Sequence, residues 1–219
     1  MRVLVIAAHP DDEVLGPGGT VIRHVAAGDE VTVFIACAGT NIRYEADRAE
    51  SLYEVARRVG ARLGTRVRLG ELPDQALDTL PLTRVVSALE GEIAAADPEL
   101  VYVHHWGDIN RDHRILSEGL MTAARPYAAA GVRTIRCFET PSSTEWGTAA
   151  GLAPFVPNLF VDVSETLAAK LDAFDAYVSE VRPWPHPRSR QALEARARTW
   201  GSVSGLPAAE AFEVARDRW

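Results

Sequence analysis

The chain has 219 residues, with 23 basic and 30 acidic side chains and a formal net charge of −7. A hydrophobic fraction of 47% and a charged fraction of 24% are those of an ordinary globular protein and argue against a mainly disordered chain. The acidic balance argues against a nucleic-acid-binding groove, which needs a basic surface. No apolar run reaches the roughly 18 residues that span a membrane, and the N-terminal run lacks the flanks of a signal peptide. We therefore expect a cytoplasmic protein.

Residues 1–140 alternate between apolar runs and amphipathic stretches. The runs predict strands over 3–8, 30–38, 66–69, 100–103 and 134–139, and the stretches predict helices over 20–27, 47–63, 83–95 and 111–124. This alternation predicts an α/β fold, a Rossmann-like and mostly parallel sheet with helices on both faces. Such a sheet binds its ligands beyond the carboxyl ends of its strands, near the point where the strand order reverses.

Residues 141–219 are less regular. Proline-rich turns over 154–157 and 183–187 flank a predicted strand over 159–163 and a helix with Leu167, Leu171, Phe174 and Val178 on one face. A last helix is predicted over 191–199. Because no linker separates these elements from the rest, we expect one domain over 1–219, in which the extension 141–219 completes the substrate pocket of the core 1–140.

Charged side chains follow the first predicted strand directly, in the segment Ala8-His9-Pro10-Asp11-Asp12-Glu13. A core position is excluded because unpaired buried charge costs several kcal/mol. An acidic surface turn is the alternative, but the segment lies between a buried strand and a glycine-rich helix start. His9 and Asp12 are three residues apart and can supply two of the three protein ligands of a catalytic zinc site. We expect the third ligand from the segment 108–113, which follows the fourth strand.

The glycines after this segment do not favour a nucleotide-binding loop. Gly16, Gly18 and Gly19 lack the G-x-G-x-x-G spacing, and acidic residues precede them where phosphate would lie. A Rossmann-type nucleotide-binding or regulatory module without catalysis therefore remains the weaker alternative.

Together, the string Ala8-His9-Pro10-Asp11-Asp12-Glu13 and the later Asn110-Arg111-Asp112-His113 resemble the LmbE-like and PIG-L superfamily of zinc-dependent N-acetylglucosaminyl deacetylases. The resemblance implies that His9, Asp12 and His113 bind the metal. It also implies that Asp11 is the general base for a metal-bound water, which attacks the acetamide. The His/Asp/His set suits Zn²⁺ and also Fe²⁺.

Three further residues are candidates for the site, two of them in the second segment. Asp112 can hydrogen-bond an imidazole and fix its tautomer, or it can serve as a helix N-cap. Asn110 stands where relatives carry Asn or His and is a candidate contact for the oxyanion or the acetyl group. Arg48 resembles a family arginine that contacts the substrate sugar, although a solvated position on a helix face explains it nearly as well.

Other candidates come from strand ends and loops outside the two motifs. Adjacent residues on a strand point to opposite faces, so at most one of His104 and His105 faces the site, and we expect His105. Glu145 and Trp146 belong to a segment rich in groups that bind sugars, and His186 lies in a stiff proline-rich loop. We expect these three to line the pocket; a capped loop with a buried Trp is the alternative for the first two.

The favoured function is hydrolysis of the N-acetyl group of an amino sugar: a GlcNAc-type glycoconjugate, a nucleotide sugar or an antibiotic sugar. A metal-dependent amidase with a non-sugar substrate is an alternative hydrolase. The expected partner is a small-molecule N-acetyl sugar, with no nucleic acid and no membrane span. The sequence leaves open the aglycone, the pathway, the native metal and whether the chain forms a homo-oligomer.

Overall fold

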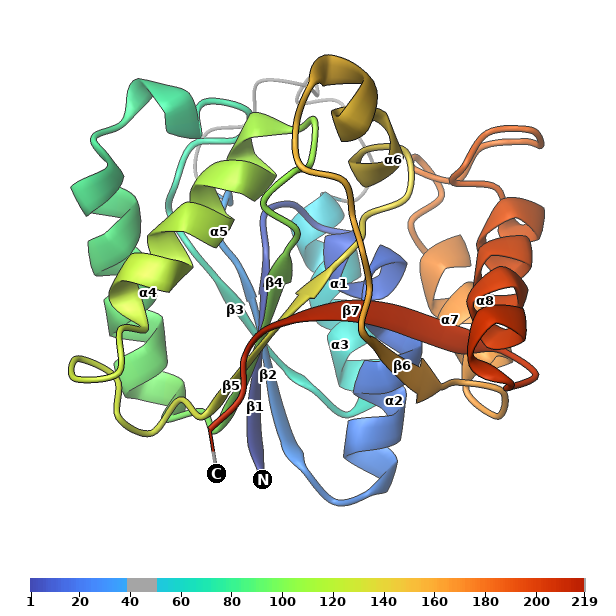
Figure 1. Cartoon of the computed structure of the whole chain (residues 1–219), viewed down its shortest axis with the longest axis horizontal. Helices are drawn as coiled ribbons and strands as arrows, with labels where there is room; N and C mark the ends of the chain where they lie inside the picture. Colours follow the sequence, from blue (N-terminus) through green and yellow to red (C-terminus); the bar gives the residue numbers. More distant parts are fainter. Residues whose placement is uncertain (39–50, 219) are drawn as a thin grey trace.

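The computed structural model describes residues 1–38 and 51–218. Its strands form a seven-stranded sheet in the order β3-β2-β1-β4-β5-β7-β6 (Figure 1). They are β1 (Arg2–Ala7), β2 (Glu30–Ile35), β3 (Arg66–Leu69), β4 (Leu100–His104), β5 (Thr134–Phe138), β6 (Leu159–Asp162) and β7 (Ala209–Arg216). Strands β1 to β5 are paired in parallel, whereas β7 is antiparallel to β5 and β6. The mostly parallel α/β fold expected from the sequence is confirmed.

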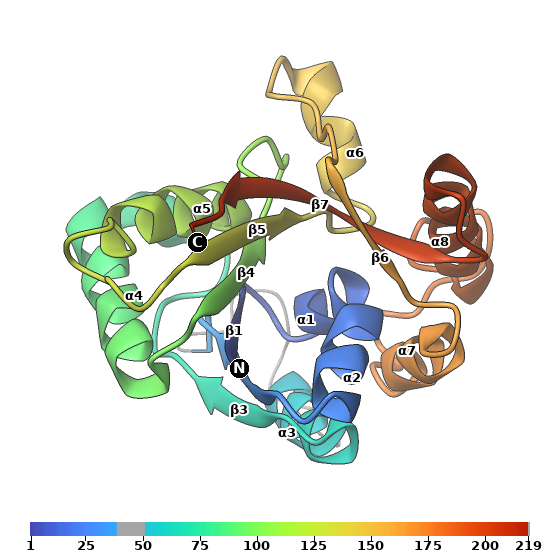
Figure 2. The same cartoon turned by 60° about the horizontal axis from the view of Figure 1, so that its bottom comes forward.

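Helices cover both faces of this sheet (Figure 2). They are α1 (Asp12–Leu15), α2 (Gly18–Ala26), α3 (Leu52–Leu63), α4 (Leu82–Ala96), α5 (Arg111–Ala123), α6 (Thr144–Gly147), α7 (Leu167–Asp175) and α8 (Arg190–Ser204), with short 3₁₀ turns η1 (Leu77–Thr79) and η2 (Thr148–Ala150). Val3 and Val5 of β1 belong to the apolar core under α2, α3, α7 and α8. Leu4 and Ile6 belong to the core under α4 and α5. Since alternate side chains point to opposite faces, the continuous apolar run of β1 reflects burial on both sides.

Local signals in the sequence set the ends of α3. The hydroxyl of Ser51 accepts the N–H of Glu54, and the Glu54 carboxylate accepts the N–H of Ser51, which is a capping box. The helix ends at Gly64, whose φ of 76° lies in the left-handed region that glycine adopts readily. The predicted helix over 47–63 therefore matches from Leu52 onward, and residues 47–50 lie outside the described residues.

Strand β7 was not among the predicted strands. Glu210 and Glu213 interrupt its apolar pattern, yet both are buried. Each carboxylate has partners: Glu210 accepts two backbone N–H groups at the start of α2 and pairs with Lys170 at 2.6 Å, and Glu213 accepts the N–H of Val156. Buried acids that are satisfied by distant parts of the chain cannot be recognised from local sequence. The C-terminal extension therefore adds two strands to the same sheet.

The prediction that Val178 belongs to the apolar face of the helix after β6 is wrong. Helix α7 ends at Asp175, and Val178 lies beyond it with 80% of its surface exposed. In the described ranges 1–38 and 51–218, no helix combines the length and the hydropathy needed to cross a membrane.

Neighbouring strands β1 and β4 create the crevice of this fold. After β1 the chain continues into α1 and α2 on one face of the sheet, and after β4 it continues into α5 on the other. The carboxyl ends of these two strands therefore open into the space where the connections diverge, which is the usual ligand position in such sheets. Both sequence motifs lie there.

Candidate metal centre and active site

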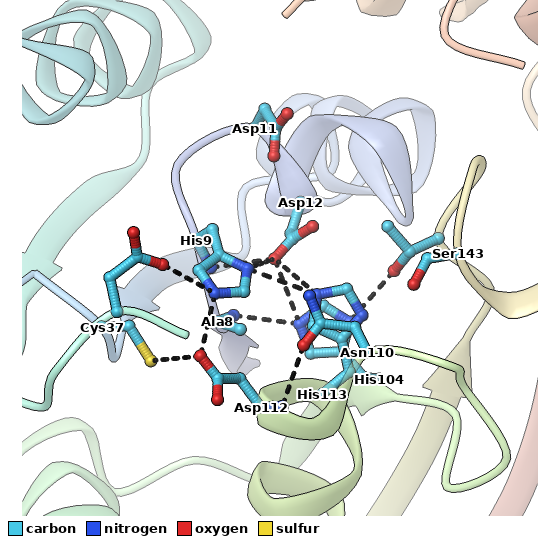
Figure 3. A network of polar contacts seen from close by, with 12 residues as sticks. Ala8, His9, Asp11, Asp12, Cys37, His104, Asn110, Asp112, His113 and Ser143 are labelled. Carbon is cyan, nitrogen blue, oxygen red and sulfur yellow. Dashed lines mark hydrogen bonds and ion pairs between the residues drawn. The ribbon is translucent and has the colours of Figure 1, made fainter. Parts of the chain in front are cut away.

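Three polar side chains from the ends of β1 and β4 converge in this crevice (Figure 3). Nδ1 of His9 lies 3.4 Å from Oδ2 of Asp12, and Nε2 of His113 lies 3.3 Å from the same oxygen. The two nitrogens are 3.4 Å apart. One donor atom of each residue lies within 4.8 Å of the others, so all three face a common point. Two imidazoles and a carboxylate are a donor set typical of a catalytic zinc site.

Electrostatics in this cluster favour a positive charge at its centre. Burial lowers the pKa of His113, but the charges of Asp12 and Asp108 outweigh burial and raise that pKa to about 9. Burial likewise opposes ionisation of Asp12, but the charge of His113 and the hydrogen bonds from His113 and His9 hold its pKa well below the usual range. The cluster therefore stabilises a charge between its nitrogens and oxygen, which is what a divalent cation would supply.

Asp112 orients one of the two imidazoles. Its Oδ2 lies 3.1 Å from Nε2 of His9, on the side of the ring that faces away from Asp12. The same carboxylate accepts the backbone N–H groups of Gln75 at 2.7 Å and Leu77 at 3.1 Å, which hold it in place. Helix α5 is capped instead by Asn110, whose side-chain oxygen accepts the N–H of Asp112. A carboxylate behind a metal-binding imidazole fixes its tautomer.

Asp108 stands behind the other imidazole. Its Oδ2 lies 3.1 Å from Nδ1 of His113, and its carboxylate accepts the hydroxyl groups of Ser143 and Thr144. Burial would raise the pKa of Asp108, but the charge of His113 and these hydrogen bonds lower it to about 2. Asp108 was considered in the sequence only as part of the segment expected to supply a ligand. Its partners lie in a loop that follows β5, so its role could not be inferred from spacing.

His104 faces the cluster. Its ring stacks on that of His113, with centroids 3.8 Å apart and planes at 12°. Its Nε2 accepts the N–H of Ala8 at 2.9 Å, and its Nδ1 lies 3.0 Å from the hydroxyl of Thr140. Burial and the charge of His113 lower the pKa of His104 to about 3, so the ring is neutral. His104 therefore supports the ends of β1 and β5.

The expectation that His105 contacts substrate is wrong. Its Nε2 lies 3.1 Å from the carbonyl oxygen of Ala153, and its Nδ1 lies 3.7 Å from Glu213. It is buried and does not line the pocket. Side chains alternate between the two faces of the sheet at the end of β4, and His104 is the one that points toward the ligand cluster. The sequence alone does not show which of the two histidines points that way.

Asp11 lies to one side of the cluster (Figure 3). Its carboxylate is held by Arg188. Its backbone has a positive φ of 112°, and its N–H donates to Glu13. Nη1 of Arg188 donates to Oδ2 of Asp11 and to Glu180, both at 2.9 Å, and Nε donates to the hydroxyl of Ser142 at 2.7 Å. Burial is the main cause that raises the pKa of Asp11 well above its usual range; Arg188 opposes it, and the neighbouring carboxylates add to it.

Arg188 was missed by the sequence analysis, although its loop was considered. The stiff loop over 183–187 does reach the pocket, but His186 does not line it. Instead, Nδ1 of His186 accepts the N–H of Arg188 at 3.0 Å and shapes the turn that presents the guanidinium. The expected substrate contact of His186 is therefore wrong, because its ring is used within the loop.

In the loop after β5, the residues that line the pocket are only partly the expected ones. Glu145 accepts the N–H groups of Ser142 and Ser143 at 2.9 and 3.0 Å, so it stabilises the turn and does not line the pocket. The two serines and Trp146 line it instead. The expected substrate contact is wrong for Glu145, whereas Trp146 lies in the pocket wall and is 46% exposed. Arg48 lies outside the described residues.

A pocket of about 320 Å³ lies over these groups. Its lining also includes two residues after β3 that the sequence analysis did not select. Oδ1 of Asp74 lies 3.2 Å and Nε2 of Gln75 lies 2.9 Å from Nε2 of His9. The signal that could have found them is their position just past a parallel strand, on the same sheet edge as His9.

The fold and the site define a class of protein: a Rossmann-like α/β protein with a His/Asp/His constellation and a second, adjacent carboxylate at the carboxyl edge of its sheet. Residues 4–124 match the PIG-L family, described as GlcNAc-PI de-N-acetylase, and the chain belongs to this family.

The chain is also similar to a named relative in sequence and to solved structures in fold. The chain is 29% identical over 231 residues to a 1D-myo-inositol 2-acetamido-2-deoxy-alpha-D-glucopyranoside deacetylase from Actinosynnema mirum, covering 84% of this chain and 82% of the relative. The A40926 pseudoaglycone deacetylase Dbv21 shares its fold, with a TM-score of 0.73, 22% identity and coverage of 100% and 98%. So does the 4-carboxy-2-hydroxymuconate hydratase GalB of Pseudomonas putida KT2440, with a TM-score of 0.72, 19% identity and the same coverage. A fold that also carries a hydratase does not define the reaction, so the function is argued from the site.

Proposed function

We propose that this protein is a metal-dependent N-deacetylase that hydrolyses the acetamide of a 2-acetamido-2-deoxy sugar. The observation that carries the proposal is the convergence of His9, Asp12 and His113 on one point, with Asp11 in the same pocket. Membership of a family of de-N-acetylases supports the reaction type. The name of the Actinosynnema relative, 1D-myo-inositol 2-acetamido-2-deoxy-alpha-D-glucopyranoside deacetylase, supports an amino sugar as the substrate class.

The donor set fits a divalent cation held by His9, Asp12 and His113. Asp112 is the carboxylate partner of Nε2 of His9, and Asp108 is the carboxylate partner of Nδ1 of His113. The other nitrogen of each imidazole is therefore left to bind the metal. When bound, a cation such as Zn²⁺ supplies a Lewis acid that polarises an amide carbonyl and makes water a stronger acid. Imidazole and carboxylate donors suit Fe²⁺ as well as Zn²⁺, so we propose zinc as one of two candidates.

Asp11 is the proposed general base. Asp11 lines the pocket together with His9 and His113, and one of its carboxylate oxygens is engaged by Arg188. The carboxylate accepts a proton from the attacking water and can return it to the departing amine nitrogen. Arg188 keeps this carboxylate in one orientation, and a fixed orientation lowers the entropy cost of the proton transfer.

Two residues are proposed substrate contacts. Asn110 lines the pocket, and because its amide oxygen caps α5, any contact with the acetyl oxygen falls to its amide nitrogen. Trp146 offers an aromatic face in the pocket wall. Asp112 acts through His9 as a positioning residue.

Two measurements on the purified protein test the proposed function. We expect about one equivalent of zinc or iron per chain by elemental analysis, and acetate release from N-acetylglucosaminides that stops after chelation and returns when metal is added back. N-acetyl amino acids of similar size serve as non-sugar amides. Equal or faster release from these compounds would favour an amidase, and acetate release that survives complete removal of metal would contradict the mechanism.

A further inference from the structure

Two large apolar side chains stand half exposed in a pocket whose other walls are mostly polar. Ile109 is 43% exposed and Trp146 is 46% exposed, and both line the pocket above the candidate metal ligands. Single exposed apolar residues are common on protein surfaces. A pair that lines the same ligand pocket needs a different explanation.

The segments that carry this pair are locked together. Ile109 lies in the loop between β4 and α5, and Trp146 lies in α6 at the carboxyl edge of the sheet (Figure 1). Asp108 binds the hydroxyl groups of Ser143 and Thr144, which joins the loop to the start of α6.

The backbones of the two segments also touch. A Cβ atom at Gly147 would lie 1.9 Å from the carbonyl oxygen of Gly107. The two backbone segments therefore approach each other too closely for a side chain to fit between them. Ile109 and Trp146 therefore belong to one preformed wall, and a ligand that binds there need not order it first.

The size of the pocket indicates which part of a substrate meets this wall. At about 320 Å³ the pocket is near the lower end of the range for small-molecule sites, so it holds a ligand of roughly monosaccharide size. The acetamide must reach the candidate metal ligands, where the lining is polar. Whatever is attached to the sugar therefore leaves the pocket past its exposed margin, where Ile109 and Trp146 lie.

We propose that Ile109 and Trp146 form a subsite for an apolar aglycone, and that the substrate is an N-acetylhexosaminide with an apolar group on its anomeric carbon. This inference rests on the proposed deacetylase function. An aromatic side chain alone would also suit the face of a sugar ring, but Ile109 offers neither a ring nor a hydrogen bond. An apolar aglycone removes both side chains from water.

A series of alkyl N-acetylglucosaminides with methyl, butyl, hexyl and octyl aglycones tests the proposal. For the native metalloprotein we expect kcat/KM to rise about twofold per methylene, half the effect of complete burial, mainly through a lower KM. We expect the rise to flatten in Ile109→Ser and Trp146→Ser. In Ile109→Ser, kcat/KM for the methyl glycoside stays within about twofold of the native value, whereas Trp146→Ser, which also removes a proposed sugar contact, lowers kcat/KM for the methyl glycoside but lowers it more for the octyl glycoside. Val203→Ser and Tyr127→Ser are matched controls, because these side chains are 61% and 102% exposed and lie outside the pocket.

Calorimetric titration with the deacetylated methyl and octyl glucosaminides measures the same preference without catalysis. Tighter binding of the octyl compound, lost in both variants and kept in both controls, supports the subsite. Equal kcat/KM across the series, or equal loss for methyl and octyl glycosides in the variants, would overturn it and leave the deacetylase function standing. Absence of acetate release from every glycoside by the metal-loaded protein would instead reject the proposed function.

Discussion

Asp11 and Asp12 are adjacent in the sequence, but their carboxylates lie in opposite environments. Asp12 faces His113 and His9, and the charge of His113 together with hydrogen bonds from both rings keeps the pKa of Asp12 well below the usual range despite burial. For Asp11, burial and the surrounding carboxylates raise the pKa well above that range, and the charge of Arg188 opposes them. Pairs of acids whose pKa values are pushed apart often have separate catalytic tasks. A ligand needs the permanently ionised carboxylate, and a base needs one that can accept a proton.

Isosteric substitutions separate these two tasks. We expect Asp11→Asn to keep its metal and to lose about 10²–10⁴-fold in kcat, because the amide cannot accept the proton of the attacking water. We expect Asp12→Asn to lose metal, because it removes the charged ligand. Elemental analysis and acetate release on both variants check this. Loss of metal in Asp11→Asn together with retention in Asp12→Asn would show that the roles are exchanged.

Arg188 determines the pH range in which Asp11 can act. Its positive charge lowers the pKa of Asp11, so Arg188→Met raises that pKa further. Because the base is active only when deprotonated, we expect the acidic limb of the kcat/KM profile to move to higher pH in this variant. Arg190→Met is the control, since Arg190 pairs with Asp172 and Asp175 at the surface. An unshifted acidic limb in Arg188→Met would show that this arginine does not govern the base.

At the level of single elements, the site depends on loops that follow four parallel strands. The candidate ligands lie in the segments after β1 and β4, with His9 in a turn, Asp12 in α1 and His113 in α5. The loop after β3 carries Asp74 and Gln75, and the loop after β5 braces Asp108 through Ser143 and Thr144. The close approach of Gly107 and Gly147 sets the distance between two of these loops.

Substitution at Gly147 tests this contact. Gly147 has a helical φ of −60°, so alanine fits its backbone, but a Cβ there would lie 1.9 Å from a backbone oxygen. We expect Gly147→Ala to lower the free energy of unfolding by about 1–3 kcal/mol, which is typical of overpacking. Gly91 lies in α4, and a Cβ added there would meet no neighbouring atom within 4 Å. Gly91→Ala should therefore be neutral or stabilising by up to about 1 kcal/mol. Urea unfolding compares the two; equal effects would mean that the two loops can separate easily.

Features of the fold and the site that depend on local sequence patterns could be predicted from the sequence. Features that depend on contacts between distant segments could not. Strands β1 to β5 and the first motif are local patterns, and the sequence predicts them. The choice between His104 and His105 depends on a register of one residue. Arg188 reaches Asp11 from the far end of the chain, and β7 is hidden by buried glutamates whose partners lie elsewhere. Contacts between distant segments leave no periodic signal in a single sequence.

At the scale of the whole molecule, the C-terminal extension holds helices α1 and α2, which follow β1, in place. The Nζ of Lys170 in α7 donates to the carbonyl groups of Leu15 and Gly16 and to Glu210 of β7. Glu210 in turn accepts the N–H groups of Gly19 and Thr20 at the start of α2, where the helix dipole favours a negative charge. The turn between α1 and α2 is thus tied to elements of the extension, which makes the extension part of the site's support as well as of its wall.

The buried side chain of His104 makes the stability of the chelated, metal-free protein depend on pH. His104 is buried and neutral, with a pKa lowered from 6.5 to about 3 by burial and the charge of His113. In the unfolded chain it takes up a proton below about pH 6.5, and the folded state does not follow until about pH 3, so its contribution to stability is lost as pH falls through this window. Between pH 7.5 and pH 5 we expect a loss of about 2 kcal/mol from this residue.

Comparison of the native protein with His104→Gln isolates this contribution. Other groups titrate in both proteins, and because His104 is neutral across this range, its replacement leaves their electrostatic surroundings unchanged. The substitution lowers the free energy of unfolding by a constant amount, since the hydrogen bonds to Ala8 and Thr140 change at every pH. We therefore expect the gap between the two proteins in urea unfolding to be smaller at pH 5 than at pH 7.5 by about 2 kcal/mol. A gap that stays constant would mean that His104 is protonated in the folded protein, and the stacked pair with His113 would then have to carry a charge on both rings or exchange it between them.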